Sequence, residues 1–264
     1  MTETPMPDLR PDIPHGARIW NYWLGGKDNY AADRQIAEAV SAEYPEMAVY
    51  AVKSRQFLNR GVRYLAGEAG IRQFLDVGTG LPTMQNTHEV AQGVAPEARV
   101  VYVDNDPLVL AHARALLVNT TPEGVTKYVD ADYRDPARIV DQASEILDFT
   151  QPVAVMFMGV FGYVPDAAEV RSIISHVMDA VPSGSHLALW DGTDTSEVVR
   201  RGAQAQADMG SPYELRTVEE IRRWFAGTEL VDPGLVPVTQ WRPEGVEVGH
   251  IEPIDAYGGV ARKP

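Results

Sequence analysis

The sequence has 264 residues and no cysteine. A chain without thiols forms no disulfide, carries no thiolate nucleophile and lacks the cysteine ligands of zinc and iron–sulfur sites. It also lacks an apolar run that approaches the roughly 18 residues needed to span a bilayer. Residues 1–14 are polar and contain four prolines, unlike the apolar core of a signal peptide. We therefore expect a cytoplasmic protein with no membrane partner.

Positive charge is scarce, with 23 Lys and Arg against 37 Asp and Glu and a net charge of −14. A field of this sign repels phosphate backbones, so we expect no nucleic-acid partner. No spacing of His, Asp and Glu suggests a metal site, and the sequence has no Gly-x-x-x-x-Gly-Lys-Ser/Thr phosphate loop. Hydrophobic residues make up 45% of the chain, enough for a core that needs neither disulfides nor a metal.

From residue 71 onward, short apolar runs alternate with helical patterns. The runs predicted as strands cover residues 71–77, 99–105, 126–132, 152–158 and 186–191. The helical patterns cover residues 82–94, 107–119, 136–147, 166–181 and 194–208. This alternation predicts right-handed crossovers and a parallel sheet that is covered on both faces, which is a Rossmann-like, doubly wound α/β fold.

The first part of the chain shows another pattern. Its prolines predict an extended arm, and residues 29–43 and 46–68 predict two helices. Gly70 can end the second helix in the left-handed conformation that other residues avoid. We therefore expect an N-terminal arm and helical extension over residues 1–70 and an α/β domain over residues 71–264.

The C-terminal part of the chain departs from the alternation as well. Thr217 begins a capping box that predicts a short helix. Residues 235–241 and 256–261 then have the composition of strands, and no helical pattern separates them. This arrangement predicts an antiparallel pair at the sheet edge rather than another crossover.

The strongest local signal is the turn that follows the first predicted strand, from Asp76 to Gly80. Gly78 and Gly80 permit a tight turn and a close approach of the backbone to a ligand. The amides around Thr79 can bind a carboxylate or phosphate at a helix start, and Pro82 suits the first turn of that helix. A purely structural strand–helix junction is the alternative. Open α/β sheets bind ligands outside the carboxyl ends of their strands, and this turn lies there.

Two further strand ends carry polar groups. Asp104 and Asn105 end the second run, where a carboxylate can accept both hydroxyls of a ribose; the alternative is a helix cap, which Asp106 can supply. Asp132 ends the third run, where a carboxylate could accept a hydrogen bond from an adenine amine. Tyr133 could add a backbone amide or a ring face. Three such strand ends in one sheet suggest a nucleoside with a charged or polar end group.

The charge of Asp76 separates two classes of nucleoside. A nicotinamide or flavin dinucleotide requires Gly-x-Gly-x-x-Gly, but Thr83 stands at the third glycine position. Asp76 would repel a diphosphate, whereas it would attract an ammonium or a sulfonium. S-adenosylmethionine has an ammonium, a carboxylate, a sulfonium, a ribose and an adenine, and it fits these groups better. A nicotinamide-dependent oxidoreductase stays open as the weaker alternative.

These motifs resemble the class I S-adenosylmethionine-dependent methyltransferases, and more closely an actinobacterial family of S-adenosyl methyltransferases. The segments that carry the resemblance are PHGARIWNYWLGGKDNY at 14–30, DVGTG at 76–80, LPT at 81–83, NTH at 86–88, VDNDP at 103–107, ADYRDP at 131–136, PGLV at 233–236, WRP at 241–243 and YGGVARK at 257–263. The resemblance implies a seven-stranded methyltransferase sheet with S-adenosylmethionine as donor and S-adenosylhomocysteine as product. It names no acceptor, for which we expect a small molecule.

The resemblance has one departure near the expected acceptor. Relatives often carry a Leu-His pair after the fourth strand, where this chain has Phe161-Gly162, and residues 190–193 after the fifth strand also look altered. A protein that binds the donor without turnover is therefore an alternative to a methyltransferase.

A catalytic base is needed only if the acceptor must lose a proton. Tyr163 and Asp191 follow the fourth and fifth strands on the side of the expected site. His88 lies in the helix after the glycine turn, where a structural histidine is the favoured interpretation. Asp166 also follows the fourth strand, where we expect a helix cap.

The N-terminal signature gathers aromatic, basic and amide side chains in an expected loop, among them Arg18 and Trp20. We interpret this loop as a lid over the donor, with Asn21 and Tyr22 nearest to it. The alternative is aromatic packing of the extension onto the sheet.

Overall fold

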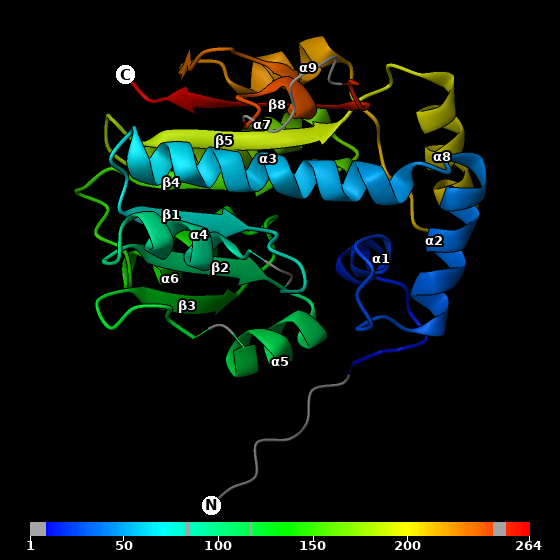
Figure 1. Ribbon diagram of the computed structural model, residues 1–264, viewed down its shortest axis with the longest axis horizontal. Coiled ribbons are helices and arrows are strands. Elements are labelled where there is room, and N and C mark those ends of the chain that lie inside the picture. Colours follow the sequence, from blue (N-terminus) through cyan, green and yellow to red (C-terminus); the bar gives the residue numbers. More distant parts are fainter. Residues whose placement is uncertain (1–8, 83–84, 117, 245–251) are drawn as a thin grey trace, which may run out of the picture.

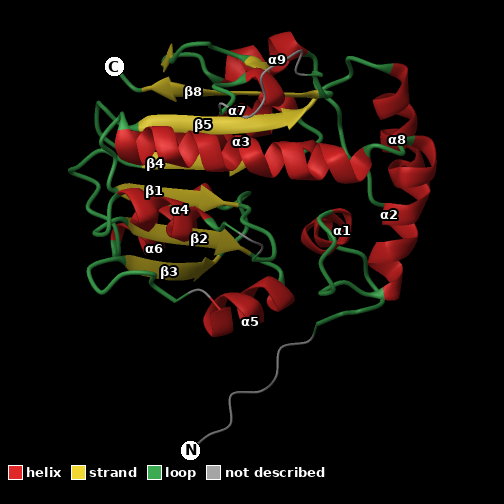
Figure 2. Ribbon diagram, in the orientation of Figure 1, coloured by secondary structure: helices red, strands yellow, loops and turns green. Residues whose placement is uncertain are grey.

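The computed structural model describes residues 9–82, 85–116, 118–244 and 252–264. An open sheet lies at its centre with helices on both faces (Figure 1, Figure 2). The strands are β1 (Gln73–Val77), β2 (Arg99–Asp104), β3 (Val125–Asp130), β4 (Ala154–Met158), β5 (His186–Gly192), β6 (Glu229–Leu230), β7 (Val236–Pro237) and β8 (Ala256–Arg262). The helices are α1 (Gly16–Trp23), α2 (Ala31–Glu43), α3 (Met47–Gly67), α4 (Thr87–Val94), α5 (Pro107–Leu116), α6 (Pro136–Ser144), α7 (Ala167–Ala180), α8 (Glu197–Asp208) and α9 (Val218–Trp224), with short 3₁₀ helices η1 (Phe161–Tyr163) and η2 (Val238–Gln240).

The main path of the sheet runs in the order β3-β2-β1-β4-β5-β8-β6, and β7 pairs with β8 beside this path. Strands β1 to β5 are parallel, whereas β8 is antiparallel to β5, β6 and β7. The order reverses between β1 and β4, because the chain builds from β1 first to β3 and then to β5. The predicted doubly wound α/β fold is confirmed. The described sheet has eight strands where the resemblance implies seven, because β6 and β7 both pair with β8.

Both faces of the sheet are buried, which explains why its central strands are apolar throughout. On one face, Phe74 of β1 and Met156 of β4 belong to an apolar cluster with residues of α3 and α4. On the other face, Leu75 and Phe157 of the same strands join residues of α6, α7 and α9. Alternate residues of a strand therefore contact different helical layers, as the two-residue period of a strand requires.

The N-terminal helices pack on the first of these faces. Ile19 of α1, Ile36 of α2 and Phe57 of α3 belong to the same buried cluster as Phe74. Figure 1 shows α3 lying along the sheet, with α1 and α2 beyond the end at which the parallel strands finish. The extension therefore shares its core with the sheet, and a division of the chain at residue 70 stays a prediction.

Helix α1 corrects the expectation of a loop in the N-terminal signature. His15 caps its first turn, because its side chain accepts a hydrogen bond from the amide of Ala17 at 3.3 Å. Gly25 follows the last turn with a φ of +77°, the left-handed conformation that ends helices. The predicted left-handed conformation of Gly70 after α3 is also present, with a φ of +69°.

Helix α4 begins later than the predicted residue 82. Asn86 is its N-cap and forms a capping box with Glu89, whose carboxylate accepts a hydrogen bond from the Asn86 amide at 2.6 Å. This reciprocal cap satisfies the amides of the first turn better than a proline start does. Pro82 therefore precedes the helix, and Thr83 lies outside the described residues.

The C-terminal strands also differ in detail from the prediction. The antiparallel pairing with β8 is confirmed, but β7 has two residues instead of the expected 235–241. Pro237 has no amide hydrogen to extend the ladder, and the chain turns into η2. The sequence pattern missed β6, which pairs with β8 on the same side as β7, away from β5. Strand β8 therefore lies inside the sheet and not at its edge.

Two further predictions concern the N-terminal arm and the membrane. The expected N-terminal arm lies outside the described residues up to residue 8. None of the helices in the described part of the chain combines the length and apolar character needed to cross a membrane.

We expect Gly258→Ala to destabilise the fold. A Cβ at Gly258 in β8 would lie 2.9 Å from the Leu189 carbonyl oxygen and 2.6 Å from Cβ of Trp190. These atoms belong to or adjoin the backbone of β5, so they cannot move away without distorting the strand. Overpacking of this kind costs about 1–3 kcal/mol. Gly61→Ala in α3 is the matched control, because its Cβ would meet no atom within 4 Å; it should keep or raise the unfolding free energy. Urea denaturation measures both, and equal effects would contradict the expectation.

Candidate functional site

A cavity of about 320 Å³ opens where the carboxyl ends of β1, β2, β4 and β5 meet. The strand order reverses at this point, which is where open α/β sheets bind ligands. Helices α1 and α3 form the opposite wall, through Ala17, Trp20 and Asn21 of the first and Ser54 and Arg55 of the second. Its size is that of a small-molecule site.

The glycine turn after β1 lines this cavity. Gly78 and Gly80 have φ values of +74° and +68°, so other residues would strain the turn. The amides of Gly78 and Thr79 donate to the Val103 carbonyl at 2.8 and 3.2 Å, and the Gly80 amide donates to Asp104. These three amides therefore hold β1 to β2, and a ligand carboxylate needs a partner elsewhere.

Asp76, one residue before the end of β1, also lines the cavity. Its carboxylate accepts a hydrogen bond from the Thr87 hydroxyl at 2.6 Å. Burial raises the pKa of Asp76, while the Thr87 hydrogen bond and the charge of Arg55 act in the other direction. A carboxylate and a guanidinium that line the same cavity are complementary to a zwitterionic ligand. The ligand ammonium would contact Asp76, and the ligand carboxylate would contact Arg55.

Asp104 ends β2 at the next strand end. Its Oδ1 accepts hydrogen bonds from the amides of Asn105 and Asp106 at 2.9 and 3.0 Å, and its Oδ2 accepts one from Gly80 at 2.7 Å. Burial raises the pKa of Asp104 in spite of these bonds. Asp106 caps α5 as predicted, because its Oδ1 accepts from the amides of residues 108 and 109. The helix cap and the candidate ribose ligand are therefore two different residues, Asp106 and Asp104.

The third strand end contributes less directly. Asp132 does not line the cavity, whereas Asn105 and Tyr133 do. The Asn105 amide nitrogen donates to Asp132 Oδ2 at 3.0 Å, so Asp132 orients a cavity residue. Burial raises the pKa of Tyr133 to about 12, which keeps its hydroxyl protonated at neutral pH.

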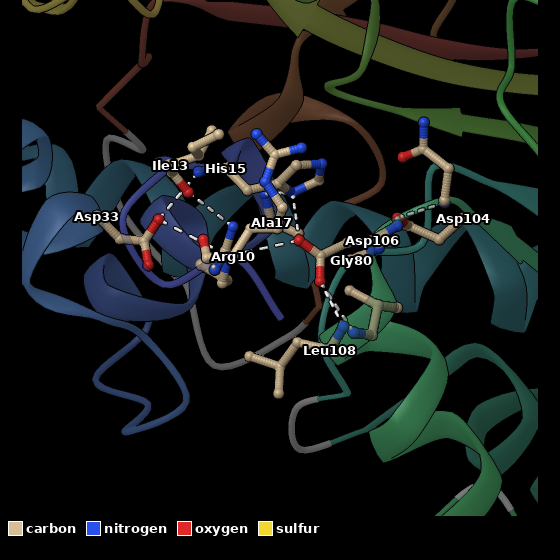
Figure 3. Close-up of polar contacts among 12 residues, drawn as sticks. Arg10, Ile13, His15, Ala17, Asp33, Gly80, Asp104, Asp106 and Leu108 are labelled. Atoms are coloured by element: carbon tan, nitrogen blue, oxygen red, sulfur yellow. Dashed lines mark hydrogen bonds and ion pairs between the residues drawn. The ribbon is translucent and has the colours of Figure 1, made fainter. Parts of the chain in front are cut away.

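Helix α1 is fastened to the β2 end of the cavity by buried charges (Figure 3). Nε of Arg18 lies 3.4 Å from Asp106 Oδ2 and 3.7 Å from Asp33 Oδ1. The backbone amide of His15, at the start of α1, donates to Asp33 at 2.9 Å. Because α1 forms a wall of the cavity, this network sets how closely that wall approaches the strand ends.

The two predicted lid residues lie on different sides of α1. Asn21 is buried and lines the cavity, and its side-chain oxygen accepts hydrogen bonds from the Asp28 amide and from Asn29. Tyr22 is not among the cavity residues; its hydroxyl donates to Glu38 of α2 at 3.3 Å. The structure therefore brings Asn21 to the candidate site and places Tyr22 at the contact between α1 and α2.

Of the predicted base candidates, one lines the cavity and the others do not. Tyr163 of η1 lines the cavity. His88 is buried beside Tyr102, whose hydroxyl lies 2.9 Å from its Nδ1, and it does not reach the cavity, in keeping with the structural interpretation. Asp166 caps α7 as predicted. Asp191 lies one layer behind the cavity wall, where it accepts a hydrogen bond from the Tyr213 hydroxyl.

Arg55 and Tyr213 are among the cavity residues that the sequence analysis missed. Arg55 lies in the middle of α3, where the only local signal was a basic residue among positions that face the sheet. Tyr213 follows α8 in a stretch without regular structure, and its neighbours in the sequence give no signal. Both reach the cavity through packing of distant segments.

The chain can now be compared with known proteins. The family described as S-adenosyl methyltransferase matches residues 2–264. The chain belongs to the S-adenosyl methyltransferase family. A DUF574 family protein from Streptomyces avermitilis shares 45% identity, with 97% of this chain and 100% of that chain covered and a TM-score of 0.92. A Thermobifida fusca protein shares 42% identity over 99% of both chains, with a TM-score of 0.89. No curated protein matches.

More distant structures share the fold of this methyltransferase. Human N-acetylserotonin methyltransferase, solved in complex with S-adenosylmethionine, is 10% identical with a TM-score of 0.52, over 92% of this chain and 62% of that one. This likeness shows the fold alone. The family match over residues 2–264 shows an S-adenosylmethionine-dependent methyltransferase, as the motifs predicted, and the nicotinamide alternative is set aside. These relatives do not identify its acceptor.

The departure at Phe161-Gly162 has a structural reason in this methyltransferase. A Cβ on Gly162 would lie 2.2 Å from Cζ of Tyr213. A larger residue at this position would therefore displace the Tyr213 ring from the cavity wall. Gly162 does not empty the site; it makes room for an aromatic side chain from another segment.

We expect the stability of the protein to carry a pH dependence that Asp191→Asn removes. Burial raises the pKa of Asp191 from 3.8 to about 6, so the folded state holds this proton more tightly than the unfolded state. Its contribution to stability is complete below about pH 4 and is lost as the pH rises through about 6. Over this window the wild type should lose roughly 2–3 kcal/mol relative to the variant. Urea denaturation across the window tests this, and a constant difference would contradict it.

Proposed function

We propose that S-adenosylmethionine binds in the cavity at the β1, β2 and β4 ends and that the methyl acceptor is a small molecule. The cavity volume of about 320 Å³ and its enclosure by α1 favour a small acceptor over a macromolecule. The observation that carries the proposal is that one cavity is lined by the oppositely charged Asp76 and Arg55 and also by Asp104 and Asn105. This set of groups fits an amino acid joined to a nucleoside.

The amino-acid end of the donor would bind between Asp76 and Arg55. Asp76 would hold the ammonium. Among the residues that the structure describes, none gives Nε of Arg55 a hydrogen-bond partner, although this nitrogen is buried. An unpaired buried donor is costly, and a carboxylate would satisfy it with a charge-assisted bond. Arg55 thus takes the role that the turn amides were expected to have.

The nucleoside end would bind at the β2 and β3 ends. Asp104 Oδ2 has one hydrogen bond in the structure, which leaves a lone pair for a ribose hydroxyl. Asn105 and Tyr133 would contact the adenine, and Asp132 would act through the Asn105 amide that it holds. Gly78, Thr79 and Gly80 would supply the close backbone surface along the donor.

Helix α1 would act as the cover of the bound donor. Its buried Asn21 would face the donor, while Tyr22 would fix the cover by its bond to Glu38. When bound, the donor supplies an electrophilic methyl group. The protein's own part is to hold the two reactants in line and to exclude water from between them. Apolar residues at the β4 end, Met158 and Val160, suit this exclusion.

Arg55→Gln should weaken S-adenosylhomocysteine binding by about ten- to a hundredfold, since one charged hydrogen bond contributes roughly 1.5–3 kcal/mol. Binding of 5′-methylthioadenosine, which has no amino-acid carboxylate, should stay within about twofold of the wild type. Arg63→Gln on the exposed side of the same helix is the control. Isothermal calorimetry measures both ligands, and an equal loss for both would contradict the assignment of Arg55.

Asp104→Ala should weaken both S-adenosylhomocysteine and 5′-methylthioadenosine, because both contain the ribose. The expected loss is about 1–3 kcal/mol for a buried charged partner. Calorimetry with NAD in parallel should show no binding by the wild type. Unchanged dissociation constants in the variant would contradict the ribose assignment.

Cellular location and the class of partners follow from composition alone and stay predictions. We propose a cytoplasmic methyltransferase without a nucleic-acid partner, on the basis of its net charge of −14.

A further inference from the structure

The β4 and β5 end of the cavity has aromatic walls. Trp20, Tyr163, Trp190 and Tyr213 line it. The rings of Trp20 and Trp190 have centroids 5.7 Å apart, and those of Tyr163 and Tyr213 lie 5.0 Å apart at 89°. A small second hollow of about 40 Å³ continues between Trp20, Tyr163 and Tyr213 toward α2 and α8. Such walls favour a flat, apolar ring.

Glycines create the space for these walls. The nearest atom to a Cβ on Gly159 would be Cη2 of Trp190 at 2.5 Å, and a Cβ on Gly162 would meet the Tyr213 ring. A Cβ on Gly192 would lie 3.1 Å from Cε1 of Tyr213. Gly159 and Gly192 at the ends of β4 and β5, together with Gly162 in η1, therefore leave the space that the two rings occupy.

Of the two tyrosines in this aromatic end, Tyr213 is bound to a buried carboxylate. Its hydroxyl donates to Oδ1 of Asp191, and Asp191 is held by the amides of Phe161 at 2.9 Å and Gly192 at 2.8 Å. Since the hydroxyl hydrogen is engaged, a ligand can use the Tyr213 oxygen only by donating a hydrogen bond to it. An acceptor whose nucleophilic atom bonds to the Tyr213 oxygen therefore carries a hydrogen on that atom.

We propose that the acceptor is a small phenol and that Tyr213, backed by Asp191, removes its proton. The proposal rests on the proposed function, because the donor must lie at the neighbouring strand ends. The phenol proton passes to the Tyr213 oxygen as the Tyr213 proton passes to Asp191 Oδ1. The phenolate oxygen forms the new bond to the methyl carbon, and the electron pair of the broken carbon–sulfur bond stays on sulfur. Tyr213 is then catalytic, and Asp191 is a positioning residue.

A phenol suits this end better than an amine. An amine at neutral pH arrives as a cation, beside the positive sulfonium of the donor, and has no free pair until it loses its proton. A phenol arrives neutral, packs its ring against the aromatic walls and gives up one proton. The pKa of Asp191, raised by burial to about 6, is close to the range in which a carboxylate works as a base at neutral pH.

Binding of 4-nitrophenol to the protein saturated with S-adenosylhomocysteine tests the proposal without turnover. The absorption spectrum distinguishes bound phenol from bound phenolate, at a pH below the solution pKa of the probe. We expect a larger fraction of the bound probe to be phenolate in the wild type than in Tyr213→Phe and Asp191→Asn, because only the wild type offers the Tyr213–Asp191 path for the proton. Tyr64→Phe, on α3 outside the cavity, is the matched control and should behave as the wild type.

The turnover number with two different acceptors is a second test. With phenol as acceptor, both variants should lose about a hundredfold in kcat, as loss of a general base does. With pentafluorophenol, which is already ionised, the loss should be less than about threefold. Equal losses for the two acceptors would mean a structural role and overturn the proton transfer. Tight S-adenosylhomocysteine binding without 4-nitrophenol binding, or with benzylamine bound instead, would overturn the phenol; no binding of S-adenosylhomocysteine would overturn the proposed function itself.

Discussion

The candidate site depends on one buried charge network that fastens α1 across the end of the sheet. Arg18, Asp33 and Asp106 are each no more than 2% exposed, and the guanidinium lies between the two carboxylates. A buried ion pair of this kind need not raise the free energy of unfolding. Removal of one partner, however, leaves the other charge buried without compensation and destabilises the fold. Because Asp106 also caps α5 and follows Asp104 closely, the position of α1 is tied to the ribose end of the cavity.

The second constraint is the reversal of strand order between β1 and β4. It places the glycine turn, Asp76 and Asp104 around one opening, while β4 and β5 carry the aromatic end. The proposed donor and acceptor ends of the cavity thus come from opposite halves of the sheet.

Glycine has two different roles at this site. Gly80 has a left-handed backbone, and a Cβ there would meet only Ala17 at 3.9 Å, so its role is conformational. Gly162 has no such backbone, and its role is the space that the Tyr213 ring occupies. The same residue type therefore means a turn in one place and a contact between distant segments in the other, which one sequence does not distinguish.

The sequence by itself determined the doubly wound sheet, most helices and the three polar strand ends, because apolar period, capping boxes and glycine turns act over a few neighbouring residues. It did not determine α1, whose cap is a histidine, or the short β6. Only the tertiary structure decided that Arg55 and Tyr213 line the cavity, that the predicted Asp191 lies behind its wall, and that Tyr22 and His88 do not reach it. These positions depend on packing between segments far apart in the chain, and no local pattern encodes which side of a helix faces a cavity formed by other elements.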